Sequence, residues 1–206
     1  MTVFTFEDVE SAEIDRRAAV YGPLADAVRE LVDATIRSTA ADADIRAAEA
    51  AVREVTARLR RDQLPGSFGI SYNSSGDSMP WGNAAIGLRN AIAPPLVIEP
   101  DPEGGYRCEV VLGAAYEGPP GHVHGGICAL VLDHIAGVAA SDGVRATSTG
   151  TLTLRYRRGT PLGPLVARAR AERTEGVKTF ITATLGDAGG VTVEADGIFI
   201  VPSWAR

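Results

Sequence analysis

The chain has 206 residues, of which 45% are hydrophobic and 22% are charged, and its formal net charge is −6. This composition is typical of a globular protein and excludes an intrinsically disordered chain. The net acidity argues against a nucleic-acid surface, so no nucleic acid is expected as a partner.

Residues 7–64 follow a helical pattern, with apolar residues recurring at the spacing of one helix face. In the first helix Pro23 suits a first-turn position. The second is expected from Asp42, a possible N-cap, to Arg61, where the sequence LPG at 64–66 ends it. We therefore predict an N-terminal helical extension over residues 1–65.

Residues 66–105 are rich in Gly, Pro, Ser and Asn, which predicts a long irregular segment with one short strand at Leu96–Glu99. A connection of this length inside a compact domain usually has a functional role. We expect it to shape a pocket.

From residue 106 the pattern is one of strands around a single helix. An alternating segment begins at Tyr106, an apolar helix follows, and four more β-rich segments occupy 149–158, 165–174, 178–187 and 191–201. We predict an antiparallel meander of these four strands with the helix on one face. This is an α+β architecture, and its domain is predicted to span residues 66–206.

The segment GPPGHVHGGICALVLDHIAG, residues 118–137, is the most informative part of the sequence. A helix starting at Gly126 would leave free N–H groups at its first turn, and Gly125 and Gly126 would let a ligand approach them closely. Such amides can bind a carbonyl oxygen that becomes an oxyanion. Asp133 interrupts the apolar run and is therefore the candidate catalytic carboxylate.

Gly126 and Asp133 are seven residues apart, which is roughly 10 Å along a helix axis. A reacting carbonyl must lie about 3 Å from both an oxyanion donor and a nucleophile or base. One helix cannot supply both groups to one substrate. The spacing predicts a homodimer with antiparallel helices; a dimer of dimers is the alternative assembly.

The histidines have a structural and a metal-binding interpretation. His122 and His124 have H-x-H spacing, but only His134 and carboxylates could complete a metal site, so no metal is expected. His124 is predicted to position the Gly-Gly turn by hydrogen bonding. No Walker A loop, G-x-S-x-G or G-x-G-x-x-G motif is present in the sequence.

The segment HGGICALVLDHIAG resembles the H-G-G-x₆-D signature of hotdog-fold acyl-CoA thioesterases of the phenylacetate-pathway (PaaI-like) and THEM-like type. The segments TSTGTLTLRYRRGTPLG and VEADGIFIV resemble later strands of the same family. The resemblance covers about residues 90–201. It implies a hotdog fold, in which an antiparallel sheet wraps around one long central helix, here with the N-terminal helical extension.

The resemblance also implies roles for individual residues. Asp133 would act as general base or nucleophile, Gly126 would polarise the thioester carbonyl, and Thr149 would hold the water or the carboxylate. His124 would support the turn. Gly159 departs from the family pattern, which commonly has proline there.

An acyl- or aroyl-coenzyme A is the expected substrate, and no cofactor is expected other than the coenzyme A it carries. Gly125 is expected to contact the substrate. Arg155, Arg157 and Arg158 are expected to bind its phosphates. The other interpretation of this arginine cluster is the solvent-exposed face of the strands. Two alternatives are a hotdog hydratase or dehydratase, which would use His134 beside Asp133, and a non-catalytic acyl-CoA-binding module.

Three features predict a cytoplasmic protein without a membrane span. Cys108 and Cys128 lack a CxxC spacing, which fits a reducing compartment. The sequence MTVFTFEDVE at the start shows no signal-peptide pattern. The longest apolar run is interrupted by Asp133 and His134 and is too short to cross a bilayer.

Overall fold

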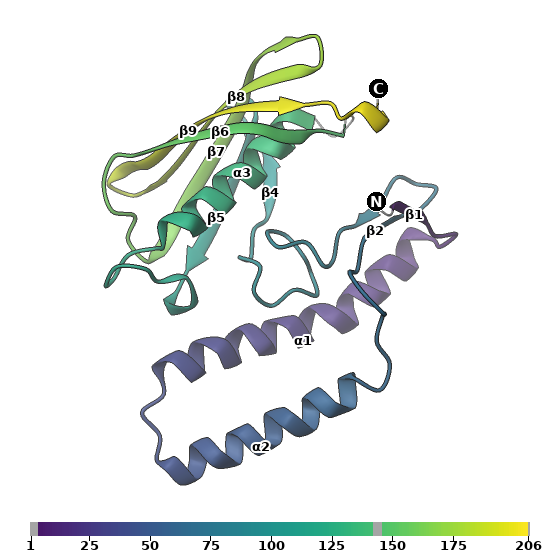
Figure 1. Cartoon of the computed structure of the whole chain (residues 1–206), viewed down its shortest axis with the longest axis vertical. Helices are drawn as coiled ribbons and strands as arrows, with labels where there is room; N and C mark the ends of the chain where they lie inside the picture. The colour runs from purple at the N-terminus through teal and green to yellow at the C-terminus, as the bar shows by residue number, and fades with distance from the viewer. Residues whose placement is uncertain (1–3, 142–145, 206) are drawn as a thin grey trace. The chain divides into compact units, whose positions relative to one another are not determined.

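A computed structural model describes residues 4–141 and 146–205 of the chain (Figure 1). Its contacts divide the chain into two compact units. The first contains the residues up to Asn83 together with Gly87–Ala91, and the second contains Ala84–Ile86 and the residues from Ile92 onward. The structure thus groups residues 66–83 with the N-terminal helices, whereas the sequence places a boundary at residue 65. The extent of a catalytic domain that folds on its own stays a prediction.

The first unit contains two long helices and a small sheet. Helix α1 spans Ser11–Arg37 and helix α2 spans Asp42–Leu59. Strand β1 (Phe4–Phe6) pairs in parallel with β2 (Ile70–Tyr72), which pairs antiparallel with β3 (Ser78–Met79). The sequence pattern did not predict this sheet, because strands of two or three residues are too short to show alternation.

The expectation that Pro23 lies in a first helical turn is wrong, because α1 begins at Ser11 and contains Pro23 in its interior. Contacts on the N-terminal side of the proline hold this part of the helix. Arg17 forms ion pairs with Glu7 and Glu13, and the centroid of the Tyr21 ring lies 6.2 Å from that of the Trp81 ring. The predicted N-cap is off by one residue, since Ala41 precedes α2 and Asp42 is its first residue.

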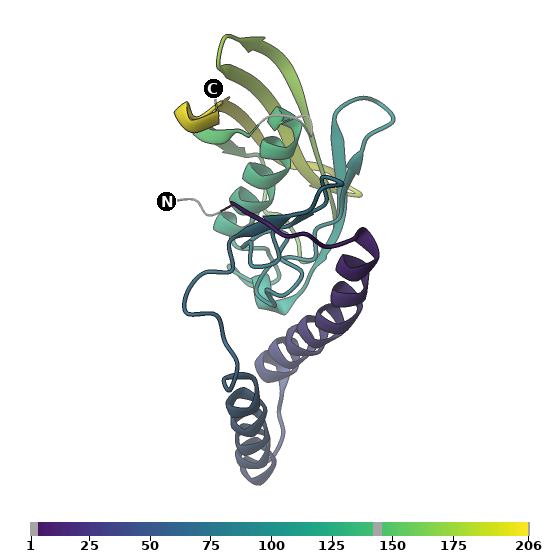
Figure 2. The ribbon, with the colours of Figure 1, turned by 90° about the vertical axis from the view of Figure 1, so that its right-hand side faces the viewer.

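The second unit is a six-stranded antiparallel sheet with one long helix, α3 (Gly125–Ser141), on one face, as both views show (Figures 1 and 2). The sheet order is β4-β5-β7-β8-β9-β6. Short 3₁₀ turns lie at Ala114–Tyr116 and Ser203–Ala205. The strands are β4 (Ile98–Pro100), β5 (Tyr106–Leu112), β6 (Ser148–Tyr156), β7 (Gly163–Glu175), β8 (Lys178–Asp187) and β9 (Gly190–Ile200). This is the hotdog arrangement, and the predicted fold class is confirmed.

The predicted meander of four strands is correct only for β7, β8 and β9. Strand β6 pairs with β9 at the far edge of the sheet, not with β7. The connection at 157–162 does not form a hairpin, because it makes hydrogen bonds to the loop before α3. The Val123 N–H donates to the Thr160 carbonyl, and the Leu162 N–H donates to the Gly121 carbonyl. Turn signals in the sequence mark where strands end but do not identify their partners.

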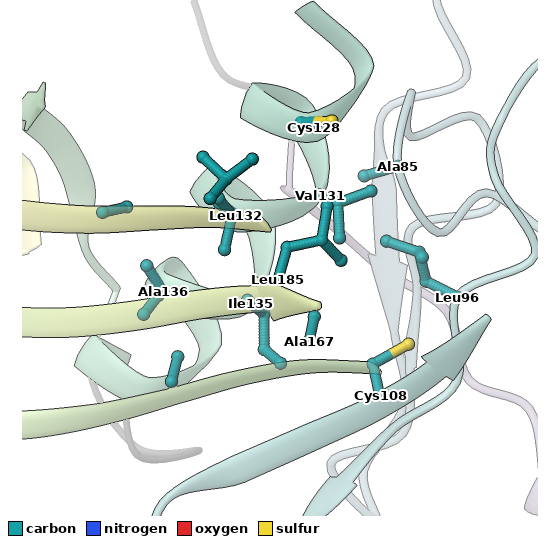
Figure 3. Close-up of a cluster of buried hydrophobic side chains, with 14 of the residues drawn as sticks. Ala85, Leu96, Cys108, Cys128, Val131, Leu132, Ile135, Ala136, Ala167 and Leu185 are labelled. Carbon is teal, nitrogen blue, oxygen red and sulfur yellow. The ribbon is translucent and has the colours of Figure 1, made fainter. Parts of the chain in front are cut away.

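The core lies between α3 and the sheet (Figure 3). Alternate residues of β5, β7, β8 and β9 point toward the helix, as the pleat of a strand requires. The side of α3 against the sheet is apolar and almost completely buried, which fixes the helix on the sheet. Its buried residues are Cys128, Val131, Leu132, Ile135, Ala136, Ala139 and Ala140.

Within the described residues, none of the helices combines the length and the apolar character needed to cross a membrane.

Candidate active site

Asp133 and Thr149 meet where α3 passes strand β6. The Thr149 hydroxyl donates a hydrogen bond to Asp133 Oδ1 over 2.8 Å. Asp133 is half-buried, at the border between the face of α3 that packs on the sheet and the face that does not. The two residues predicted to act together are therefore in direct contact, and the carboxylate is held by a neutral donor rather than by a cation.

A β-bulge directs Thr149 toward the helix. The register of β6 against β9 shifts between Thr149, opposite Phe199, and Thr151, opposite Ile198, so that Gly150 is an inserted residue. In a regular strand Thr149 and Thr151 would point to the same face of the sheet. The insertion turns Thr149 to the opposite face, where Asp133 lies.

Gly150 is suited to the bulge by its lack of a side chain. A Cβ at this position would lie 2.7 Å from the Ile200 Cδ1 atom and 3.1 Å from the Ile198 carbonyl oxygen. A larger residue would require the Ile200 side chain to move and the Ile198 carbonyl to shift by a few tenths of an ångström. The glycine inside a β-rich segment was the available sequence signal for this feature.

His124 caps α3 in the manner predicted for it. The helix begins at Gly125, one residue before the predicted start, and His124 immediately precedes it. The Gly126 N–H donates to His124 Nδ1 over 3.0 Å, and the Ile127 N–H donates to the His124 carbonyl over 2.8 Å. Since Nδ1 accepts a hydrogen bond here, the neutral imidazole carries its proton on Nε2.

This cap changes which amide of the helix start is free. The Gly126 amide, predicted to polarise a carbonyl, already has the His124 ring as its acceptor. Among the described residues the Gly125 amide donates no hydrogen bond. The unsatisfied donor at the positive end of α3 is therefore that of Gly125.

Two further residues position the helix start, and neither was predicted as a site residue. The Tyr156 hydroxyl donates to the Gly125 carbonyl over 2.8 Å, and burial raises the pKa of this phenol. Gly118 lies against His124, since a Cβ at Gly118 would be 2.7 Å from the His124 Cα. Strand β6 thus contacts α3 at both the carboxylate and the helix start.

The structure gives a physical reason for glycine at position 159. A Cβ at Gly159 would lie 2.5 Å from the His122 Cδ2 and 2.9 Å from its Nε2. The His122 ring is fixed there, because its Nδ1 lies 2.8 Å from the Pro120 carbonyl and must donate to it. With the His122 ring in this orientation there is no room for the Cβ of a proline at position 159.

The three arginines predicted at the phosphates are each paired with a carboxylate. Arg155 contacts Asp196, Arg157 donates to Glu194 over 2.6 Å, and Arg158 donates to Asp187 over 3.1 Å. The hydrogen bond from Arg157 lowers the pKa of Glu194, so the carboxylate stays charged. The cluster is therefore neutralised within the chain and is not a free cationic patch.

His134 follows Asp133 but points elsewhere, because successive helical residues are about 100° apart. Its Nε2 atom is buried without a hydrogen-bond partner among the described residues. Burial lowers the pKa of His134, and the charge of Asp133 opposes this shift to a smaller extent. The imidazole is therefore neutral near pH 7.

In the part of the chain that the structure describes, no three His, Cys, Asp or Glu residues gather in a way that could hold a metal ion.

The free Gly125 amide and the Asp133 carboxylate cannot act on the same atom within one chain. Eight residues of helix separate them, which is about 12 Å along the axis. Strand β6, which touches both, is at the edge of the sheet and pairs with β9 on one side only within the described residues. The sequence predicted a site shared between two chains from the distance between Gly126 and Asp133 along the helix. The same argument applies to the distance between Gly125 and Asp133.

Comparisons with known proteins agree with this fold. The family model of the thioesterase superfamily matches residues 120–194, which include α3 and most of β6 to β9. The crystal structure of protein RHA08564, a thioesterase superfamily protein, is 33% identical and superimposes with a TM-score of 0.77 over 87% of this chain and 90% of that one.

Two curated relatives match a shorter part of the chain. Acyl-coenzyme A thioesterase THEM4 of Xenopus laevis is 34% identical over 91 residues, which are 43% of this chain and 41% of the relative. THEM4 of Rattus norvegicus is 33% identical over 92 residues, covering 43% and 39%. The matched region thus spans about two fifths of the length of these relatives.

The fold and the site together are those of a hotdog protein that carries a carboxylate on its central helix. On the match to RHA08564 over nearly the whole of both chains, this protein belongs to the thioesterase superfamily.

Proposed function

We propose that this protein hydrolyses the thioester of an acyl- or aroyl-coenzyme A to the free acid and coenzyme A. The observation that carries the proposal is the hydrogen bond from Thr149 to Asp133, beside a helix whose first amide is free. The relatives named acyl-coenzyme A thioesterase support coenzyme A as the thiol of the substrate.

In the proposed reaction the thioester carbonyl oxygen accepts a hydrogen bond from the Gly125 amide. The helix dipole adds to the stabilisation of the oxyanion that forms when the carbonyl is attacked. His124 and Tyr156 hold this amide in place through the Gly126 amide and the Gly125 carbonyl. They are positioning residues and do not touch the substrate.

Asp133 supplies either of two modes of attack. As a general base it takes a proton from water, whose oxygen bonds to the carbonyl carbon while the C–S bond breaks and the thiolate is protonated. As a nucleophile its carboxylate oxygen bonds to the carbonyl carbon while the C–S bond breaks and the coenzyme A thiolate leaves, and water then hydrolyses the acyl anhydride to the free acid and the Asp133 carboxylate. In both modes Thr149 orients the carboxylate or the attacking water.

Two chains are proposed to build each site. Because Gly125 and Asp133 of one helix are too far apart, an antiparallel second copy of α3 would bring its carboxylate to the first copy's amide. In the part of the chain that the structure describes, β6 has one edge without a partner strand, which supports this arrangement, since pairing with a second β6 would extend the sheet and bring the two helices together.

The remaining substrate contacts follow from the position of strand β6. Arg157 directly follows Tyr156, which touches the helix start, so the three arginines lie at the end of β6 where the nucleotide would leave the site. Exposed ion pairs are worth about 0–1 kcal/mol, so a phosphate can compete for these guanidinium groups. The domain that binds substrate is proposed to be residues 66–206, and its compartment the cytoplasm, which the free cysteines Cys108 and Cys128 support.

A thiol-release assay on a panel of acyl-coenzyme A substrates tests the proposal. We expect release of coenzyme A by the wild type, and a fall in kcat of roughly 10²-fold or more for Asp133→Asn. A hydratase or dehydratase using His134 would change the acyl group and leave the thioester intact. A binding module would retain acyl-coenzyme A without turnover, and either result would refute the proposal.

A further inference from the structure

Helix α2 carries an apolar row that none of the described residues covers. Ile45, Val52, Val55 and Leu59 are each between 39% and 49% exposed, and none of the residues of α2 is buried. In Figures 1 and 2 the helix extends from a short connection after α1. Most of the stability of a helix in a protein comes from packing of its apolar face, so this face of α2 should have a partner.

The spacing of the row is that of a coiled coil. Ile45, Ala48, Val52, Val55 and Leu59 are separated by three, four, three and four residues, which are alternating a and d positions of a heptad repeat. A surface helix that packs on a globular core usually has a wider apolar stripe. The pattern therefore favours another helix as the occupant.

The charges beside the row indicate which helix this is. Residues 42–50 contain three acidic side chains and one arginine, whereas residues 51–61 contain four arginines and one glutamate. In an antiparallel pair of identical helices the acidic half of one lies along the basic half of the other. Helix α2 is therefore electrostatically complementary to a second copy of itself.

The flanking positions also favour the antiparallel over the parallel orientation, because the parallel pair brings two pairs of carboxylates together and the antiparallel pair only one, Glu49 with Glu49 of the partner subunit. With Ile45 at a, Asp44 is at g and Glu49 at e, and in a parallel pair these two carboxylates would face each other across the interface. Consider an antiparallel pair in which Ile45 lies opposite the partner's Val55. Asp44 is then offset from Arg58 of the partner subunit by two residues, which is about 3 Å along the helix axis. The long arginine side chain can span this offset.

We infer that α2 forms an antiparallel two-helix coiled coil with α2 of a second copy of this chain. The interface is separate from the proposed pairing of α3 and β6, since it involves only α2. The pairing buries the apolar row of both helices and places Asp44 of each beside Arg58 of the other. If both interfaces form, the assembly is a dimer of dimers.

Exchange of charges tests the pairing and its direction. Asp44→Arg and Arg58→Asp should each weaken self-association roughly tenfold or more, because each puts two like-charged pairs at the interface. An equimolar mixture of the two variants should associate again as a heterodimer. The introduced arginine then faces the introduced aspartate at one end, and the native pair of Asp44 and Arg58 is kept at the other. Sedimentation equilibrium measures all three samples. Failure of the mixture to recover would overturn the antiparallel arrangement.

Two further variants test the apolar row with a matched control. Val52→Lys, in the row, should reduce association by at least roughly a hundredfold, since an unpaired ammonium in an apolar interface is costly. Ala50→Lys, on the opposite side of the same helix, should leave it unchanged. Equal association of both variants and the wild type would show that α2 does not pair.

Cross-linking gives a readout that is independent of the α3 interface. Ala51 is at a g position close to the twofold axis, and both native cysteines are buried. Ala51→Cys should form an intermolecular disulfide on mild oxidation, whereas Ala47→Cys, away from the row, should not. Thiol release per chain is expected to stay unchanged in Val52→Lys, so loss of this interface and loss of the proposed function can be told apart.

Discussion

The Thr149 hydroxyl reaches Asp133 Oδ1, 2.8 Å away, because one extra residue in β6 turns it toward α3. The carboxylate and its donor thus come from different elements whose relative placement depends on a bulge. The chemistry proposed for Asp133 should be sensitive to changes in β6 that leave the helix itself unaltered.

Removal of the Thr149 donor should impair catalysis while the fold is retained. A hydrogen bond to a charged group is worth about 1.5–3 kcal/mol, so Thr149→Val should lower kcat by roughly 10- to 100-fold. Thr149→Ser keeps the hydroxyl and should remain within about threefold of the wild type. Steady-state thiol release measures both. Equal activities for the valine and serine variants would show that the hydroxyl has no role.

Substitution of Gly150 should give the same defect without touching either residue of the pair. The Cβ of Gly150→Val would be 3.1 Å from the Ile198 carbonyl oxygen and 2.7 Å from Ile200 Cδ1, and its two methyl groups need further room, so we expect the bulge to shift and Thr149 to move from Asp133. We expect kcat to fall roughly as far as in Thr149→Val. Thr151→Val, on the opposite face of the strand, is the control. Normal turnover by the Gly150 variant would mean that the bulge does not position Thr149.

The sequence predicts the fold and the residues of the candidate site well. It predicts less well which strands pair and which hydrogen bonds those residues make. Periodicity locates α3 and the strands to within one to three residues, since each buries an apolar face on the same core. It cannot assign the edge position of β6, because an exposed edge strand has the same alternation as any other. The partner of β6 depends on the contacts of the loop at 157–162, which no local pattern encodes.

The details of the site depend on contacts between distant segments. The cap on the Gly126 amide requires the orientation of the His124 ring, and Gly118 permits that ring to approach. The neutralisation of Arg157 by Glu194 requires the pairing of β6 with β9. Residue types indicate the available chemistry, whereas the three-dimensional pairing decides which donor is free.

His134 should make the stability of the protein depend on pH. Burial lowers the pKa of this imidazole below its ordinary value of 6.5, so the unfolded chain binds a proton at a higher pH than the folded chain does. The unfolded state thus holds more protons below about pH 6.5, and the free energy of unfolding should fall as the pH drops through this window.

Urea unfolding at pH 7.5 and 5.5, at one protein concentration, measures this effect. His134→Leu should lose less stability between the two pH values than the wild type does, since it has no group to protonate. His122→Gln, which replaces an exposed histidine, should behave as the wild type. The same pH dependence in the His134→Leu variant would assign the effect to other groups.

The pairing of Arg157 with Glu194 should limit binding of the coenzyme A phosphates. Arg157→Ala is expected to raise KM for acyl-coenzyme A by roughly 3- to 10-fold, the size of a partly exposed charge contact. KM for an acyl-pantetheine, which lacks the nucleotide phosphates, should not change. Glu194→Gln frees the guanidinium and should lower KM for acyl-coenzyme A.

The control for the arginine is Arg173→Ala, which removes a cation paired with Glu175 outside the cluster. It should leave KM for both substrates unchanged. An equal rise of KM for acyl-coenzyme A and acyl-pantetheine in Arg157→Ala would place this arginine away from the phosphates.

Mixing two inactive variants should restore activity if each site is shared between chains. Asp133→Asn removes the carboxylate, and Gly125→Val blocks approach to the free amide. In a mixed dimer one site receives both intact groups and the other receives neither. Random exchange makes about half of the dimers mixed, so recovery should approach about a quarter of wild-type activity if the sites act independently. Thiol release after subunit exchange measures it, with exchange itself followed by mass spectrometry of differently labelled chains. No recovery despite exchange between folded variants would show that Gly125 and Asp133 of a single chain act together, and that α3 does not pair as proposed.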